Sequence, residues 1–96
     1  MLPSPYDYLR PDAYRYFEMK QGGVLFRQGD ATFGLFVVIS GCVHLERVAA
    51  NGERIVIHRA LDGASFAEAS IFSETYHCDA VVIQPGTVVR IDKAAV

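Results

Sequence analysis

The chain has 96 residues, of which 51% are hydrophobic, and its net charge is -2. This length supports one domain with a modest core, and the nine Lys and Arg residues are scattered singly, which argues against DNA binding by this chain alone. The apolar runs are too short for a membrane span and the N-terminus lacks signal-peptide zones, so we expect a cytoplasmic protein with no membrane contact.

The first segment is rich in proline and tyrosine. Pro3 and Pro5 favour an extended arm, and residues 11–17 predict two helical turns that begin at Pro11, where its missing N–H does no harm. We therefore divide the chain into an arm with a short helix (residues 1–16) and a single β domain (residues 17–96).

Short stretches rich in Val, Ile and Phe then alternate with glycine-containing turns. This alternation is typical of an all-β sandwich or barrel. The clearest hairpin has Asn51-Gly52 in its loop, because this pair supplies the positive φ that a tight reversal needs. The predicted strands are residues 24–27, 35–39, 42–47, 53–59, 78–83 and 87–91, with turns at 40–41 and 85–86.

Two further segments have helical character. Residues 66–72 contain good helix formers with fourfold spacing, so we expect a single helical turn that interrupts the sheet. Asp92 can cap a new helix and alanines follow it, so the chain is expected to stop inside or just before a helix.

The two cysteines, Cys42 and Cys78, are far apart and form no CxxC motif, so we expect buried free thiols. His77 beside Cys78 raises the alternatives of a metal site or redox sensing, but neighbouring residues on a strand face opposite sides. Plain strand residues are therefore favoured, and redox sensing through Cys78 remains an alternative.

Enzyme chemistry has no obvious residues to carry it. His44, His58 and His77 suggest a cupin-like metal enzyme as an alternative, but they lack a close His-x-His pair with a nearby carboxylate. No nucleophile elbow, phosphate-binding glycine loop or paired-carboxylate arrangement is present. We expect a protein that is not an enzyme and holds no metal.

Four stretches, residues 23–30, 34–45, 66–72 and 76–80, resemble the effector domain of the Crp/Fnr family of bacterial transcription regulators. The resemblance implies a mainly β, jelly-roll barrel (a cyclic-nucleotide-binding-like β-roll) with a short N-terminal helix and a short cassette helix between two strands. In that family a long dimerisation helix and a helix-turn-helix DNA-binding domain follow. The resemblance thus implies a sensor half, a homodimer in the full-length regulator, and DNA binding only through a C-terminal domain absent from this chain.

The resemblance also implies a ligand site. A cyclic nucleotide needs backbone N–H groups and a cation for its phosphate, and an acceptor for its ribose hydroxyl. Glu68 matches the family's ribose-binding glutamate, Cys78 stands where the family has its phosphate-binding arginine, and Asp79 stands at the next Ser or Thr position. The candidate ligand-binding residues are Phe66, Ala67, Glu68, Ala69, Ser70, Cys78 and Asp79.

These departures weaken the expected binding of a cyclic nucleotide. The cation is lost at Cys78 and an anion is gained at Asp79, so we predict that cyclic AMP and cyclic GMP do not bind at micromolar concentrations. Ala67, where the family often has glycine, is expected to be a milder change that still allows a helical first turn. We expect no cofactor and an unknown small-molecule effector. A stand-alone module that docks a protein partner, or binds another small ligand, is the alternative.

Overall fold

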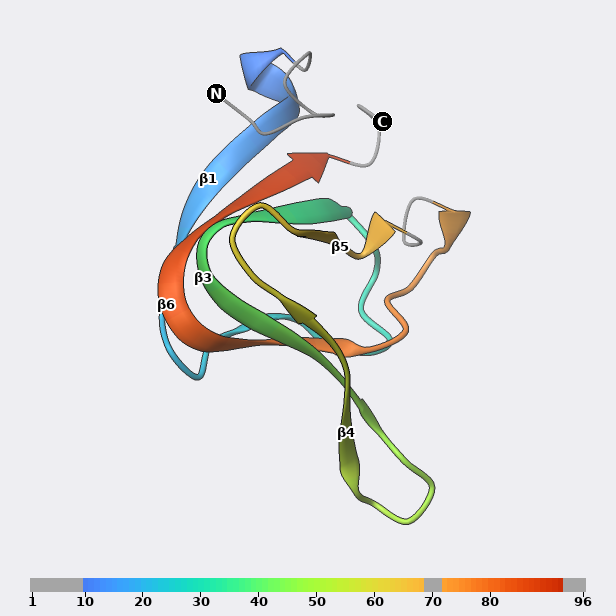
Figure 1. Ribbon diagram of the computed structural model, residues 1–96. Coiled ribbons are helices and arrows are strands. Elements are labelled where there is room, and N and C mark those ends of the chain that lie inside the picture. Colours follow the sequence, from blue (N-terminus) through green and yellow to red (C-terminus); the bar gives the residue numbers. More distant parts are fainter. Residues whose placement is uncertain (1–9, 69–71, 93–96) are drawn as a thin grey trace.

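The computed structural model describes residues 10–68 and 72–92 (Figure 1). The described chain is mainly β and antiparallel, as predicted. Its elements are the 3-10 turn η2 (Pro11–Ala13) and the strands β1 (Tyr14–Met19), β2 (Val24–Phe26), β3 (Gly34–Val48), β4 (Arg54–Ala60), β5 (Ser65–Phe66) and β6 (Asp79–Asp92).

Two long strands, β3 and β6, organise the sheet. The strand order is β1-β6-β3-β4, with β2 also on β6 and β5 also on β3. The β3–β6 pair curves through the molecule, and the β3–β4 hairpin projects from one end of it (Figure 1). Strands β1 and β2 lie along different parts of β6, and together these strands form a β-roll.

The bends in β3 and β6 occupy positions that we predicted to be turns. Residues 35–39 and 42–47 belong to one continuous strand, and so do 79–83 and 87–91. Gly41 has a φ of 100°, and the β3–β6 register shifts on both sides of Ser40. A Cβ atom at Gly86 would collide with the carbonyl oxygen of Ser40. These glycines therefore permit two facing bulges that bend the strand pair, and the predicted chain reversals are wrong.

The predicted helix over residues 11–17 is also wrong. Only Pro11–Ala13 form a helical turn, and β1 begins directly afterwards at Tyr14. Every residue of β1 is in register with β6, from Tyr14 opposite Ile91 to Met19 opposite Gly86. Aromatic residues suit strands well, so pairing with a distant strand overrides the weak local helical signal.

The β3–β4 hairpin confirms the turn prediction at Asn51-Gly52. Val48 pairs with Arg54, the backbone N–H of Ala49 donates to the carbonyl of Glu53 at 2.8 Å, and Gly52 has a φ of 87°. Glycine adopts this conformation without steric cost. Local turn chemistry therefore fixes the register of the hairpin.

The main core lies inside the roll and is rich in aromatic side chains. Phe26 stacks on Tyr76 with ring centroids 3.8 Å apart, and Phe36 stacks on Phe66 at 5.2 Å. Cys42 and Cys78 are both buried and free, as predicted. A smaller apolar cluster comprises Leu35, Val37, Val89 and Ile91.

The predicted arm within residues 1–9 and the predicted helix after Asp92 lie outside the described residues. Within the described ranges, no helix has the length and apolar character needed to cross a membrane.

Candidate functional site

A cavity of about 330 Å³ lies between the β3–β4 hairpin and the segments that lead into and out of the predicted cassette. This volume is at the small end of the range for ligand pockets in proteins. Its wall is largely apolar, with a few polar groups. The lining residues are Phe26, Leu45, Arg47, Ile57, Ala67, Glu68, Tyr76, His77 and Cys78.

The cavity gathers three of the seven predicted ligand-binding residues: Ala67, Glu68 and Cys78. Phe66 is 1% exposed and packs in the core instead. Asp79 does not line the cavity. Ala69 and Ser70 lie outside the described residues. Of the predicted helix over 66–72, Phe66 is the last residue of strand β5, and residues 69–71 are not described.

Ala67 carries the chain from β5 into the cassette segment in an unfavourable backbone conformation. Its φ of 66° lies in the left-handed region, which costs a non-glycine residue roughly 1–2 kcal/mol. Ala67 itself is therefore not part of a helix, and Glu68, which follows it, has a 3-10 conformation. Glycine would adopt this conformation at lower cost, because it lacks the Cβ atom that makes this region unfavourable.

Cys78 presents a neutral thiol to the cavity. The residue is 8% exposed, and desolvation raises the pKa of its thiol, an effect that the nearby Arg47 partly offsets. A thiol with a raised pKa is a poor nucleophile and a poor metal ligand at neutral pH. This environment disfavours redox sensing through Cys78.

His77 and Cys78 both line the cavity, contrary to the prediction that they face opposite sides of a strand. The reason is that β6 begins only at Asp79, so strand alternation does not apply to the two preceding residues. The His77 ring lies 3.0 Å from the hydroxyl of Ser73. In residues 10–68 and 72–92, no three His, Cys, Asp or Glu side chains gather as a metal site would require.

Arg47 supplies a positive charge that the sequence reasoning missed. It projects from β3 at the cavity rim, where its Nε donates to the carbonyl oxygen of His77 at 3.2 Å. The alternation along β3 could have indicated this position, because Val43 and Leu45 point into the roll and Arg47 is the next residue on that face.

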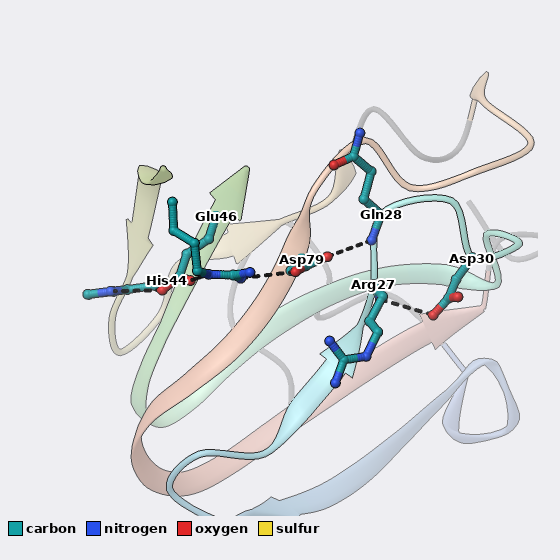
Figure 2. Close-up of polar contacts among 7 residues, drawn as sticks. Arg27, Gln28, Asp30, His44, Glu46 and Asp79 are labelled. Atoms are coloured by element: carbon teal, nitrogen blue, oxygen red, sulfur yellow. Dashed lines mark hydrogen bonds and ion pairs between the residues drawn. The ribbon is translucent and has the colours of Figure 1, made fainter. Parts of the chain in front are cut away.

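Asp79 belongs to a polar network outside the cavity (Figure 2). Its carboxylate accepts from the backbone N–H of Gln28 at 2.7 Å and from Nη2 of Arg54 at 3.0 Å. Asp79 also lies directly opposite Glu46 in the sheet, and Arg54 bridges the two by donating from Nε to Glu46 at 2.8 Å. Arg54 thereby offsets the repulsion between two facing carboxylates.

The network shifts the pKa values of its members. The hydrogen bond from Gln28, and then that from Arg54, lower the pKa of Asp79, while Asp79 and Glu46 raise the pKa of Arg54. Asp79 is therefore a paired structural carboxylate. The expected repulsion between Asp79 and a ligand in the cavity has no support in this geometry.

A β-roll with a cavity between its hairpin and the segment before the last strand is the architecture of a cyclic-nucleotide-binding-like domain. The chain belongs to the cyclic nucleotide-binding domain family, which matches residues 16–96. A comparison with curated proteins finds no match.

Similar solved structures include transcription regulators of the Crp/Fnr type. The sensor domain of the transcriptional regulator DNR from Pseudomonas aeruginosa is 26% identical, with a TM-score of 0.81 over 88% of this chain and 57% of that one. A putative cyclic nucleotide binding protein from Ruegeria pomeroyi is 29% identical, with a TM-score of 0.84 over 96% of this chain and 41% of that one.

Thermus thermophilus catabolite activator protein shares the fold at 22% identity, with a TM-score of 0.81 over 94% of this chain and 46% of that one. The chain thus spans between 41% and 57% of the length of these three structures. It is related to the sensor domains of Crp/Fnr regulators.

Proposed function

We propose that the chain is the sensor domain of a Crp/Fnr-type transcription regulator, and that its cavity takes a small molecule other than cyclic AMP or cyclic GMP. One observation carries this proposal: the thiol of Cys78, which the resemblance places at the family's phosphate-binding arginine, is buried and neutral at the cavity wall. The domain itself is not an enzyme and needs no cofactor.

The lost cation has a sizeable energetic effect. A hydrogen bond to a charged group contributes roughly 1.5–3 kcal/mol, so its loss weakens phosphate binding by about one to two powers of ten. Arg47 is a partial substitute at best, because its Nε already donates to the His77 carbonyl. The largely apolar wall favours a ligand that is less polar than a cyclic nucleotide.

In this proposal, the bound small molecule acts by changing the position of the cassette relative to the chain that follows β6. A ligand shifts such an equilibrium only by the difference in its affinity for the two arrangements. Helix-mediated dimerisation and DNA binding are functions of the full-length regulator and not of the β-roll.

Isothermal titration calorimetry with cyclic AMP and cyclic GMP tests this proposal. We expect no binding at micromolar concentrations to the natural chain, and at least about tenfold tighter binding to Cys78→Arg. Cys78→Ser is the matched control, since it changes the thiol without adding charge, and it should gain nothing. Micromolar binding of either nucleotide to the natural chain would refute the proposal.

One observation favours a second function, the docking of a protein partner by a stand-alone module. Ile55, Val56 and Ile57 on β4 are each about half exposed, at 48%, 50% and 48%. Neighbouring residues of a strand point to opposite faces, so these side chains lie on both faces of the projecting hairpin, and large exposed apolar side chains favour an interaction site. The hydrophobic dye ANS should then bind the natural chain and lose affinity for Val56→Glu. A chain that stays monodisperse at high concentration and binds no dye rules this function out.

A further inference from the structure

Strand β4 lies at an open edge of the sheet. Among the described residues it pairs with β3 only, and the β3–β4 hairpin projects away from the rest of the roll (Figure 1). All residues of β4 except Ala60 are exposed. The edge of a sheet presents unpaired backbone N–H and C=O groups, to which a further strand can add. The position of β4 therefore gives a strand from another molecule access to this edge.

The apolar side chains of β4 lie on both faces of the hairpin. Ile55 and Val56 are neighbours on a regular part of the strand, so they point to opposite faces, and both are about half exposed. A partner that packs against one face would leave the other face exposed. A strand that adds at the edge extends both faces at once and gives each apolar side chain a neighbour across the new pair. The distribution of these side chains therefore favours pairing at the edge.

The hydrogen bonds of the hairpin determine which backbone groups face the open edge. The N–H of Ala49 donates to the carbonyl of Glu53, so these two residues form a hydrogen-bonded pair. Hydrogen-bonded and non-hydrogen-bonded pairs alternate along an antiparallel ladder. The next pairs in register are Val48 with Arg54, Arg47 with Ile55 and Glu46 with Val56. By this alternation, Arg54 and Val56 point their N–H and C=O groups away from β3.

A bulge ends the regular part of this edge. The β3–β4 register shifts between Leu45 and Glu46, so Ile57 is an extra residue in β4. A bulge leaves its extra residue unpaired and twists the strand, which hinders the addition of a strand beyond it. The edge that suits a further strand is therefore residues 54–56.

A second copy of the chain fits this edge in one register. Two identical antiparallel strands are related by a two-fold axis, which can lie at Arg54, Ile55 or Val56. An axis at Arg54 places like charges directly opposite each other, and an axis at Val56 pairs Arg54 with His58, beyond the bulge. An axis at Ile55 pairs Arg54 of each copy with Val56 of the other. Each of these pairs then exchanges both N–H···O hydrogen bonds, because the groups of both residues point outward.

We propose that two copies of the chain associate by pairing their β4 strands antiparallel about a two-fold axis at Ile55. The two Ile55 side chains face each other on one side of the joined sheet, and Val56 packs against the aliphatic part of the other copy's Arg54 on the opposite side. The charge of Arg54 is offset within its own chain, because it donates to Glu46 at 2.8 Å and to Asp79 at 3.0 Å. The contact is small, so the association is weak and reversible. It requires neither a ligand in the cassette cavity nor the dimerisation helix of the full-length regulator.

Disulfide trapping in a glutathione redox buffer tests the register. At a non-hydrogen-bonded pair the two Cα atoms lie about 4.5 Å apart, within the range of a disulfide, so Ile55→Cys should form a covalent dimer. Val56→Cys is the matched control, because its two copies lie on the diagonal, roughly 7–8 Å apart, and it should cross-link at least about tenfold more slowly. Cys42 and Cys78 are buried in both variants and contribute the same background. Equal rates, or no covalent dimer from Ile55→Cys, would overturn the proposal.

A proline variant tests the backbone pairing. Sedimentation equilibrium of the natural chain should show a mass that rises with concentration towards that of a dimer. Val56→Pro removes an N–H that points away from β3, so the hairpin keeps its own hydrogen bonds while both copies lose a bond across the axis. Association should weaken at least about tenfold, whereas Val56→Thr, which keeps the N–H and the β-branched shape, should weaken it less.

Two results of this measurement contradict the proposal. Unchanged association of a folded Val56→Pro chain would show that the β4 backbone is not the contact. A natural chain that stays monomeric at millimolar concentration would overturn the pairing and leave the edge to a different protein. If Val56→Pro does not fold, the comparison of Ile55→Cys with Val56→Cys decides the question by itself.

Discussion

Replacing Ala67 with glycine should stabilise the domain, although the substitution removes a methyl group. The φ of 66° costs alanine roughly 1–2 kcal/mol relative to glycine. Glycine also lowers the free energy of unfolding by about 0.4–1 kcal/mol, because it increases the conformational entropy of the unfolded chain. The net expected gain for Ala67→Gly is therefore about 1 kcal/mol, which corresponds to a rise in Tm of roughly 4–8 °C for a domain of this size.

Urea denaturation followed by circular dichroism measures this gain. Ala50→Gly is the matched control, because Ala50 is exposed in the β3–β4 loop and is not among the residues with positive φ. The control should lose about 0.4–1 kcal/mol, for the same entropic reason that limits the gain at position 67. If both variants lose stability to the same extent, the left-handed conformation of Ala67 does not store the strain we assign to it.

Gly86→Ala should destabilise the domain by more than about 2 kcal/mol, because the new Cβ would collide with backbone atoms. Gly52→Ala has open space around it and should lose only about 1–2 kcal/mol, the cost of its positive φ. Thermal denaturation compares the two variants. Tyr76→Phe should lose about 1–3 kcal/mol in the same assay, since the buried Tyr76 hydroxyl donates to the carbonyl of Gly34 at 2.9 Å. Asp79 has a lowered pKa in the fold, so its stabilising contribution is full above the pKa of the unfolded chain, near 3.9, and is lost as pH falls through the lower folded value. Asp79→Asn should therefore cost about 1 kcal/mol at neutral pH and little in strong acid, and equal losses at both would contradict the pairing.

Features determined by local chemistry could be predicted from the sequence. Asn51-Gly52 correctly placed a hairpin loop, since a short reversal depends on the residues within it. The burial of Val43 and Leu45 followed from their alternation with polar neighbours. The resemblance in residues 66–72 and 76–80 pointed to the segments that border the cavity, and Ala67, Glu68 and Cys78 line it.

Features determined by distant partners could not be predicted in this way. Tyr14 and Phe17 follow Pro11 in a run too short for its periodicity to decide between helix and strand, and their pairing with β6 fixes the strand. Gly41 and Gly86 indicate unusual backbone, but a reversal and a bulge require the same residue. Asp79 acquires its partners Gln28 and Arg54 from other elements, so its local sequence shows nothing of its pairing.

The central place of β6 has a consequence for how the protein forms. Strands β1, β2 and β3 all pair with β6, and pairs such as Gly34 with Asp92 join residues far apart in the chain. Such topologies fold slowly, on a millisecond-to-second timescale. During synthesis, β1, β2 and β3 are made before residues 79–92, so their backbone groups remain unpaired and able to bind other chains. This protein should therefore depend on chaperones during its synthesis.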